Sequence, residues 1–252
     1  PGGGSLDMTW REQLHTDGFA LLPSALTAAA VASALAGWDR VARAHADGGV
    51  LLASGTGPAY GARNLLELWP EVVEMVRREP LRGSLLEVLG PNAGVVRVLY
   101  FDKPPGHSWA LPWHKDYSLA VREHHNSARF TKPTVKAGVP HVIAPKEILD
   151  RMLTVRVHLD AMTPENGPLR VIPGSHRFYT QENDDPRPAV TLHGAAGDVL
   201  LMRPLVTHAS GHSTSSELHR RIVHLECTAD RELTDGLQWK WFIPIAPHGG
   251  TS

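Results

Sequence analysis

The chain has 252 residues, a formal net charge of -1 and 42% hydrophobic residues. This length suits one large domain or two small ones, and the near-neutral charge argues against a nucleic-acid partner, which usually requires a basic excess. No apolar run approaches the roughly 20 residues that cross a bilayer, and no signal peptide is evident, so we also expect no membrane partner.

Two features of the chain bear on its origin and compartment. Residues 1–5, Pro-Gly-Gly-Gly-Ser, are typical of a cloning remnant, so we exclude residues 1–7 and expect Met8 to be the native start. The only cysteine, Cys227, lies in an apolar run, which favours a buried thiol over a nucleophile. A single cysteine fits a reducing compartment, and we predict a cytoplasmic protein.

Residues 8–92 are predicted to be a mostly helical support. Residues 17–23 indicate a turn and a short strand. Residues 26–45 are rich in alanine, with apolar residues at helical spacing and Thr27 as a suitable N-cap. Two further helices are expected at 70–77 and 81–89, the second ending at Gly90-Pro91.

Residues 93–245 change character and predict a core of short strands separated by Gly and Pro turns, which is typical of a sandwich or jelly roll. We expect residues 8–252 to form a single domain. Residues 118–150 are a long insertion rich in basic residues, His and Pro, with a short helix near 146–151; such insertions often form lids. The predicted strands are 95–101, 153–159, 169–172, 199–202, 205–210, 221–227 and 239–244.

The segment Trp113-His114-Lys115-Asp116-Tyr117 offers half of a metal site on one short predicted strand. Side chains two residues apart on a strand share a face, so His114 and Asp116 can reach one ion while Lys115 points away. Two imidazoles and one carboxylate form the facial triad that holds Fe(II) and leaves coordination positions open. Taken alone, His-x-Asp is a weak signal that also fits a surface charge pair.

The best candidate for the third ligand is His208, which follows an apolar strand and shares a face with Ser210. His212 is a rival. Arg220 and Arg221 open the next strand, where a guanidinium could grip a carboxylate bidentately, with Ser210 donating to the same group.

Several motifs, in order along nearly the whole chain, resemble the phytanoyl-CoA dioxygenase family of Fe(II)/2-oxoglutarate oxygenases. The resemblance implies a mainly β fold, a double-stranded β-helix (a cupin-like jelly roll), with flanking helices and an N-terminal helical region. The matching pieces are Asp17-Gly18-Phe19, Lys103-Pro104-Pro105-Gly106, the segment 112–116, the segment 166–176, Gly197-Asp198-Val199, and His208-Ala209-Ser210-Gly211 with Arg220-Arg221.

The resemblance also implies roles for single residues. His114, Asp116 and His208 would bind iron, and Ser210 with an arginine would hold the far carboxylate of 2-oxoglutarate. Arg220 fits the family's position better than Arg221, and the two side chains face opposite ways. With O2, such a site releases succinate and CO2 as it oxidises the substrate. Because Asp116 is present where related halogenases carry a small residue, hydroxylation of a small molecule is favoured.

The remaining candidates stay open. Arg156 lies on the polar face of a predicted strand with Thr154 and His158, and contacts either the co-substrate or substrate or a structural carboxylate such as Asp160. Trp113 and Tyr117 either wall the pocket or pack in the core, and His224 fits a core or supporting position. The basic insertion motivates the hypothesis of an anionic substrate; its basic side chains are Arg122, His124, His125, Lys132, Lys136 and His141.

Two other classes of function compete with this interpretation. A cupin-type metal enzyme that does not use 2-oxoglutarate would keep the metal ligands but need no buried arginine after His208. A non-catalytic binding module of the same fold would show a degraded site, and no ligand is missing from this sequence.

Overall fold

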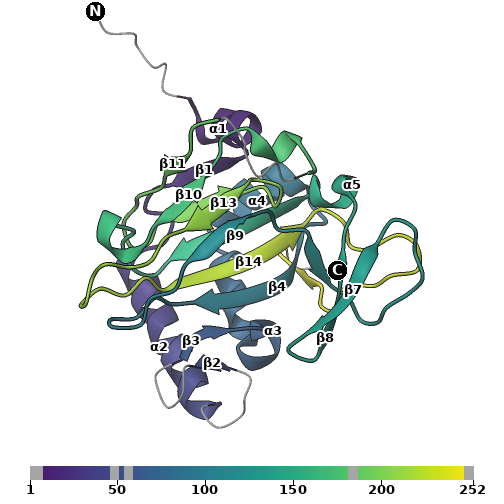
Figure 1. Ribbon diagram of the computed structural model, residues 1–252. Coiled ribbons are helices and arrows are strands. Elements are labelled where there is room, and N and C mark those ends of the chain that lie inside the picture. The colour runs from purple at the N-terminus through teal and green to yellow at the C-terminus, as the bar shows by residue number, and fades with distance from the viewer. Residues whose placement is uncertain (1–7, 46–50, 54–58, 181–186, 247–252) are drawn as a thin grey trace, which may run out of the picture.

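The computed structural model describes residues 8–45, 51–53, 59–180 and 187–246 (Figure 1). The expected cloning remnant at residues 1–7 lies outside this part of the chain. The fold is mainly β with an N-terminal helical region, as predicted. Among the described residues, no helix is long and apolar enough to span a bilayer.

The N-terminal helices follow their sequence signals closely. Helix α1 (Trp10–Asp17) begins at a capping box formed by Thr9 and Glu12, and α2 (Ala28–Ala44) begins at Thr27, whose hydroxyl accepts from the Ala30 amide. Helix α3 (Leu65–Leu68) is short, and α4 (Leu81–Leu89) ends at Gly90 as predicted. The helix expected at 70–77 is instead a 3-10 helix, η1 (Pro70–Met75), with Pro70 in its first turn.

The largest sheet has eight strands and forms the centre of the molecule. Its path runs β1-β12-β9-β14-β4-β3-β2, and β15 pairs with β4. The bounds are β1 (Phe19–Leu22), β2 (Leu51–Ala53), β3 (Ala59–Ala62), β4 (Gly94–Phe101), β9 (Met152–His158), β12 (Val199–Met202), β14 (Ile222–Thr228) and β15 (Ile243–Pro244).

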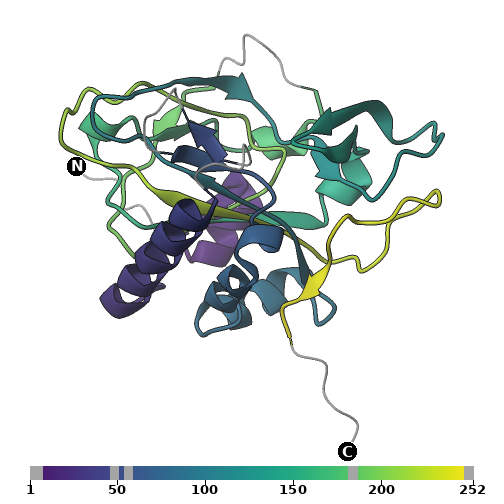
Figure 2. The same cartoon turned by 90° about the horizontal axis from the view of Figure 1, so that it is seen from below.

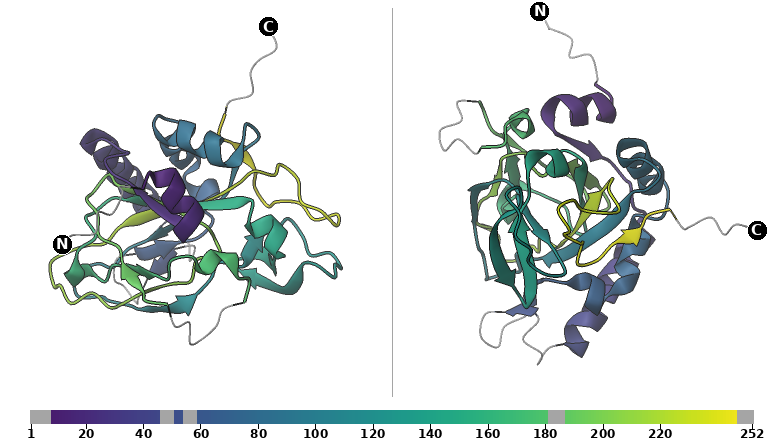
Figure 3. Two further views of the ribbon diagram at one scale, coloured as in Figure 1. Left: turned by 90° about the horizontal axis from the view of Figure 1, so that it is seen from above. Right: turned by 90° about the vertical axis from the view of Figure 1, so that its right-hand side faces the viewer.

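A four-stranded sheet in the order β11-β10-β13-β5 covers one face of the large sheet and completes the jelly roll. Its strands are β5 (Leu111–His114), β10 (Leu169–Val171), β11 (Val190–Thr191) and β13 (His208–Ser210). The N-terminal helices lie on the side of the large sheet away from this second sheet (Figures 2 and 3). Short 3-10 turns η2 (Pro164–Asn166) and η3 (Ser175–Arg177) flank β10.

The insertion at 118–150 is ordered as a small sheet of its own. Strands β6 (Ser118–Ala120), β7 (Thr131–Lys136) and β8 (Val139–Ile143) pair in the order β6-β8-β7, and α5 (Lys146–Leu149) follows. The hairpin of β7 and β8 stands at one end of the barrel (Figure 1).

Two predicted strands are shorter in the structure. The strand expected at 205–210 begins only at His208, because the Val206 amide donates to Arg203 and closes a turn there. The strand expected at 239–244 is reduced to β15, and Trp239 makes only an isolated bridge with Val121.

The central strands β4, β9 and β14 separate apolar from polar side chains by their period of two. The outward face, which includes Val98, Val155 and Val223, packs with the helices in the main hydrophobic core. The opposite face, which includes Arg156 and Glu226, points into the barrel. The helices therefore stabilise the sheet from outside, and the barrel interior is left for polar groups.

Gly18 and Gly138 test how tightly the N-terminal region is joined to the barrel. Gly18 has φ of 86° and Gly138, in the turn between β7 and β8, has φ of 76°, but a Cβ on Gly18 would overlap the His176 ring and lie 2.7 Å from Val206, whereas nothing lies within 4 Å of a Cβ on Gly138. Backbone strain costs both alanine variants about 1–2 kcal/mol. The overlap should cost Gly18→Ala about 1–3 kcal/mol more in unfolding free energy, measured by urea denaturation. Equal losses in the two variants would contradict this packing.

Candidate active site

Pairing of β5 with β13 brings together two histidines that are 94 positions apart in the sequence. His208 lies directly opposite His114 in the register of the two strands, and their ring centroids are 4.1 Å apart. Strand β5 ends at His114, so the prediction of one strand through Tyr117 is wrong. Asp116 is held instead by its own amide, which donates to Pro204 O at 2.9 Å, and its carboxylate still reaches the two imidazoles.

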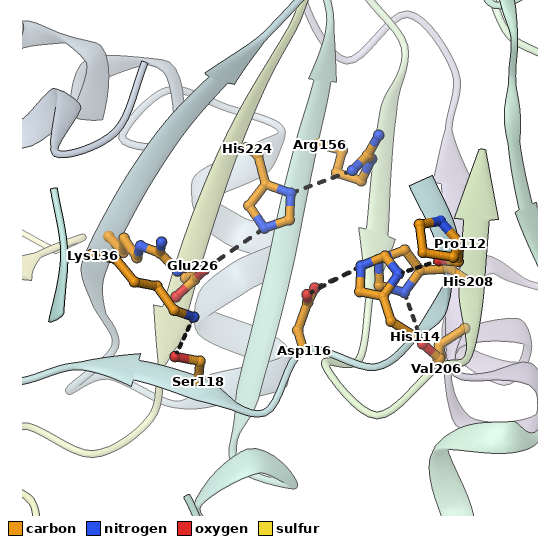
Figure 4. Close-up of polar contacts among 11 residues, drawn as sticks. Pro112, His114, Asp116, Ser118, Lys136, Arg156, Val206, His208, His224 and Glu226 are labelled. Carbon is orange, nitrogen blue, oxygen red and sulfur yellow. Dashed lines mark hydrogen bonds and ion pairs between the residues drawn. The ribbon is translucent and has the colours of Figure 1, made fainter. Parts of the chain in front are cut away.

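His114, Asp116 and His208 converge, with one potential ligand atom from each lying within 4.8 Å of the others. The Asp116 oxygens lie 3.8 Å from Nε2 of His114 and 3.8 Å from Nε2 of His208 (Figure 4). The side chains of His114 and Asp116 are each 29% exposed, whereas that of His208 is 2% exposed. The cluster is therefore open to solvent on the Asp116 side.

Hydrogen bonds fix the tautomer of both rings. Nδ1 of His114 lies 2.8 Å from Pro112 O, and Nδ1 of His208 lies 2.9 Å from Val206 O (Figure 4). Because a carbonyl only accepts, each Nδ1 carries the proton and each Nε2 presents a lone pair toward Asp116. Burial lowers the pKa of His208 to about 4, which keeps its ring neutral at neutral pH.

The Asp116 carboxylate is suited to a cation. Its Oδ2 is buried and has no hydrogen-bond partner among the described residues. Burial would raise the pKa of Asp116, but the neighbouring histidines and Arg156 outweigh burial and keep it below the ordinary value. Two imidazole lone pairs and an unpartnered carboxylate oxygen facing one point fit a divalent transition metal.

The turn after β10 is hydrogen-bonded to both segments that carry the three candidate ligands. Lys115 points away from the cluster, as predicted, and its Nζ donates to Ser175 O at 2.7 Å and to Phe178 O at 2.6 Å. The Ser175 hydroxyl accepts from the Thr207 amide at 2.8 Å. Ser175 therefore ties the residue after His114 to the residue before His208.

A second polar cluster, formed by Lys103, Ser210 and Arg220, lies buried beside the first. Nζ of Lys103 donates to Ser210 Oγ at 3.2 Å, and Nη1 of Arg220 donates to Gly167 O at 2.6 Å. Gly167 has φ of 65°, and a Cβ there would lie 2.9 Å from Lys103 Nζ, so glycine permits this close approach. The segment 166–176 thus supplies a carbonyl to the cluster.

This cluster is strongly cationic. Lys103 is fully buried and Arg220 is nearly so. Burial, followed by the charges of Arg220 and Arg156, lowers the pKa of Lys103 to about 7, and burial lowers the pKa of Arg220 to about 9. No carboxylate of the described residues makes an ion pair with either side chain, and Arg220 Nε is buried without a partner there. A carboxylate supplied by a ligand would fit.

The side chains of the two candidate arginines, which directly precede β14, point to opposite sides of the chain. Arg221 lies on the opposite side from Arg220 and makes a two-pronged ion pair with Asp160, at 2.8 and 2.7 Å. Asp160 is therefore not the partner of Arg156, contrary to one of the two expectations. Arg156 is buried, and its Nη1 lies 3.4 Å from Nδ1 of His224 (Figure 4). Burial lowers the pKa of Arg156 to about 10.

The other sequence candidates lie outside these clusters. His212 is exposed. Tyr117 donates to Tyr179 O at 2.6 Å and packs against the second hydrophobic core, and Trp113 lies under the Arg170 guanidinium, 5.2 Å from its ring centre.

Sequence reasoning missed Lys103, because the prolines that follow it indicate a loop. Its place directly after an apolar strand was the available signal.

Comparisons with known proteins agree with this geometry. The family described as "Phytanoyl-CoA dioxygenase (PhyH)" matches residues 14–222. EctD from S. alaskensis, solved with 2-oxoglutarate and 5-hydroxyectoine, is similar with a TM-score of 0.68 and 18% identity, over 90% of this chain and 78% of that one. No curated protein gave a match.

Two further similar structures come from nogalamycin biosynthesis. The non-heme alpha ketoglutarate dependent carbocyclase SnoK has a TM-score of 0.66 and 18% identity, over 93% of this chain and 92% of that one. The corresponding epimerase SnoN has a TM-score of 0.61 and 20% identity, over 87% and 80%. At these identities the likeness concerns the fold.

Metal binding can be tested residue by residue. We expect His114→Ala and His208→Ala to weaken Co(II) binding by at least about tenfold, since loss of even a ligand's hydrogen-bond partner costs that much at metal sites. The exposed His212→Ala is the matched control and should bind as the wild type does. Titration followed by the visible Co(II) absorption provides the measurement. Equal affinity in all four proteins would rule out this metal site.

Proposed function

This chain belongs to the phytanoyl-CoA dioxygenase family of Fe(II)- and 2-oxoglutarate-dependent oxygenases, and we propose that it hydroxylates a small molecule bearing an anionic group. In the proposed reaction, 2-oxoglutarate and O2 give succinate and CO2 as the substrate gains one oxygen atom. The observation that carries the proposal is the pairing of an open His-Asp-His cluster with a buried cation pair that has no carboxylate of its own.

In this proposal, His114, Asp116 and His208 hold the iron. Each imidazole is oriented through the carbonyl two residues before it, and the neutral rings donate Nε2 lone pairs without a proton to lose. When bound, iron with 2-oxoglutarate supplies the oxidising chemistry. The protein keeps the coordinating atoms in place and leaves the Asp116 side open for a substrate.

Arg220, Lys103 and Ser210 are proposed to bind the far carboxylate of 2-oxoglutarate. The guanidinium and the hydroxyl can donate to it, and the buried location strengthens each bond to a carboxylate. The three protons of the Lys103 ammonium already have Ser210 Oγ, Gly167 O and Gly211 O as acceptors, so Lys103 contributes through its charge. Arg156 lies between the two clusters and is proposed to contact the co-substrate near the metal, because burial leaves its charge uncompensated by any nearby carboxylate other than Asp116.

Hydroxylation is proposed over other outcomes on two grounds. Asp116 would supply a carboxylate ligand at the position where related halogenases carry a small residue. The EctD structure holds a hydroxylated molecule, 5-hydroxyectoine. The single-domain organisation over residues 8–252 and the cytoplasmic location remain predictions.

Succinate release in the presence of Fe(II), ascorbate and 2-oxoglutarate tests the proposal, with His114→Ala as the inactive control. A screen of small molecules for a mass gain of one oxygen then identifies the reaction. Substrate-dependent succinate formation without oxygen gain in the product would exclude hydroxylation, and succinate formation equal in His114→Ala would exclude the proposed site.

Arg220 and Arg221 form a natural matched pair for the co-substrate. We expect Arg220→Gln to raise the KM for 2-oxoglutarate about 10- to 100-fold, because a charged hydrogen bond contributes about 1.5–3 kcal/mol. Arg221→Gln removes the Asp160 ion pair instead and should leave that KM near the wild-type value. Steady-state succinate formation measures both, and the opposite ranking would assign the role to Arg221.

The pKa of Lys103, about 7 before the co-substrate binds, gives the affinity for 2-oxoglutarate a pH dependence. A bound carboxylate favours the charged amine and raises this pKa, so binding takes up a proton above pH 7. Affinity should therefore be level below pH 7 and fall as pH rises above it, by up to about tenfold per unit. Lys103→Met should bind more weakly and lose this slope. Anaerobic titration calorimetry from pH 6 to 9 measures it, and a flat wild-type profile would refute it.

A further inference from the structure

The inner face of the large sheet carries a third polar cluster, beyond the metal ligands and away from the Arg220 end. In the register of the strands, His224 lies opposite Arg156 on β9 and Leu99 on β4, and Glu226 lies opposite Thr154 and Arg97. Arg220 precedes β14 in the chain, and His224 and then Glu226 follow on the inner face of β14 (Figure 4). The Arg97–Glu226 end is therefore on the far side of the candidate metal site from the proposed 2-oxoglutarate pocket.

The base of this cluster is a buried ion pair. Nη1 of Arg97 lies 3.0 Å from Glu226 Oε1, and the two side chains are 8% and 10% exposed. The same Glu226 oxygen lies 3.9 Å from Nε2 of His224. Nε of Arg97 is buried and has no hydrogen-bond partner within the described residues. The ion pair thus leaves donor capacity on Arg97 unused.

The insertion adds a second cation to this pair. Lys136, the last residue of β7, is half-buried, and its Nζ donates to Ser118 Oγ at 2.9 Å, which leaves two of its three protons for other acceptors (Figure 4). Its pKa is lowered by burial and then by Arg97 and Arg63, whereas Glu226 and Asp116 act in the opposite direction. Lys136 is therefore close to the Arg97–Glu226 pair and within electrostatic reach of the metal site.

Arg63 supplies the third cation from the other side. It precedes Asn64, whose Nδ2 donates to Ala137 O at 3.1 Å in the turn between β7 and β8, so the hairpin is fastened beside it. Arg63 is half-buried, and its pKa is lowered by burial and by Arg97. Arg97 and Lys136 thus lie within electrostatic reach of Glu226, Arg63 lies within reach of these two cations, and a bound iron would take up the charge of Asp116. The cluster has a surplus of positive charge next to the open side of the triad.

We infer that Arg97, Lys136 and Arg63 bind a carboxylate of the substrate, so that a small organic acid is oxidised at a carbon held over the metal. This inference rests on the proposed function and adds the substrate class and the residues that recognise it. Arg97 is positioned by Glu226, whereas Lys136 and Arg63 are half-exposed and can meet an incoming anion. The two carboxylates, that of 2-oxoglutarate and that of the substrate, would then bind at opposite ends of one barrel.

Among the other basic residues of the insertion, His141 is buried beside this cluster. Burial, and then the charges of Arg97, Lys136 and Arg63, lower its pKa to about 4, so its ring is neutral and adds no cation. Lys132 and His125 do not join the cluster. Lys132 lies on the same strand as Lys136 but is exposed, and His125 pairs with Glu123 at 3.3 Å. Lys132 is therefore a matched control for Lys136: the same residue type, the same strand, and no place near the triad.

The test compares small carboxylic acids with their primary amides, using holoenzyme loaded with Fe(II) and 2-oxoglutarate. The panel contains aliphatic, aromatic and amino acids, each with its amide. Anaerobic changes in the visible absorption of the Fe(II)–2-oxoglutarate enzyme report binding, and succinate release with oxygen gain reports turnover. We expect at least one acid to bind about tenfold or more tightly than its amide.

In Lys136→Met, the ratio of acid to amide affinity should fall toward one, whereas Lys132→Met should keep the wild-type ratio and the wild-type basal succinate formation. Arg63→Gln should lower the ratio in the same way. Comparing the two lysine variants, and comparing each acid with its amide in both, separates loss of the electrostatic contact from a general loss of stability. Amides binding as well as acids, no acid binding, or equal ratios in Lys136→Met and Lys132→Met would each overturn the inference.

The proposed function fails separately from this inference. Substrate-free succinate formation that depends on His114, combined with a preference for neutral ligands, would leave the oxygenase assignment intact and remove only the carboxylate site. Loss of Fe(II)-dependent 2-oxoglutarate binding in the wild type would instead remove the oxygenase assignment.

Discussion

The charge buried inside the barrel is the constraint on which the rest of the structure depends. Lys103, Arg156 and Arg220 are at most 5% exposed, and none makes an ion pair with a carboxylate of the described residues. Leaving one buried charge without its partner typically costs 3–5 kcal/mol, and a whole domain is stable by only about 5–15 kcal/mol. A protein that carries such a surplus must stabilise its fold elsewhere and must gain free energy when an anion binds.

The strand alternation shows where that stabilisation comes from. On β9 and β14, residues such as Val155, Val157 and Leu225 face the helices and are fully buried in the main core, while their neighbours Arg156 and His224 face inward. The apolar and the ionic halves are thus made from the same strands. Each helix that covers the outer face stabilises the sheet whose inner face positions the reactive groups.

Much of this arrangement could be predicted from the sequence, and the reason is local. The polar face formed by Thr154, Arg156 and His158 follows directly from the period of a strand. His114 and Asp116 converge as predicted, although Asp116 lies beyond the end of β5 and is positioned by its amide bond to Pro204 O. The strand period alone does not choose between Arg220 and Arg221, because a shift of one residue exchanges the two faces; only the family resemblance favoured Arg220. In the structure Asp160 pairs with Arg221, and Arg220 is thereby turned inward.

Lys103 and Arg97 escaped prediction for a different physical reason. Their roles depend on strand register and on contacts between segments more than 60 residues apart, such as Lys103 with Gly167 and Arg97 with Glu226. In the sequence, Lys103 precedes two prolines, and Arg97 interrupts an apolar strand without a visible partner. The basic character of the insertion motivates the hypothesis of an anionic substrate, but only folding shows that Lys136 is half-buried while Lys132 is exposed.

The two ends of the barrel interior differ in burial and in charge. Arg220 precedes β14, and His224 and Glu226 follow on the inner face of that strand, so the barrel interior has a fully buried cationic end, a middle that faces the triad, and a charged end that the half-exposed Lys136 and Arg63 border. An anion held at the closed end is shielded from water, which strengthens its bonds and keeps the co-substrate in one orientation. A ligand entering from the open end must then approach the metal from the Asp116 side. In the proposed assignment, substrate choice is set by residues of the insertion and of the loop around Arg63, whereas the chemistry is set by the strands, so the two can vary independently on one scaffold.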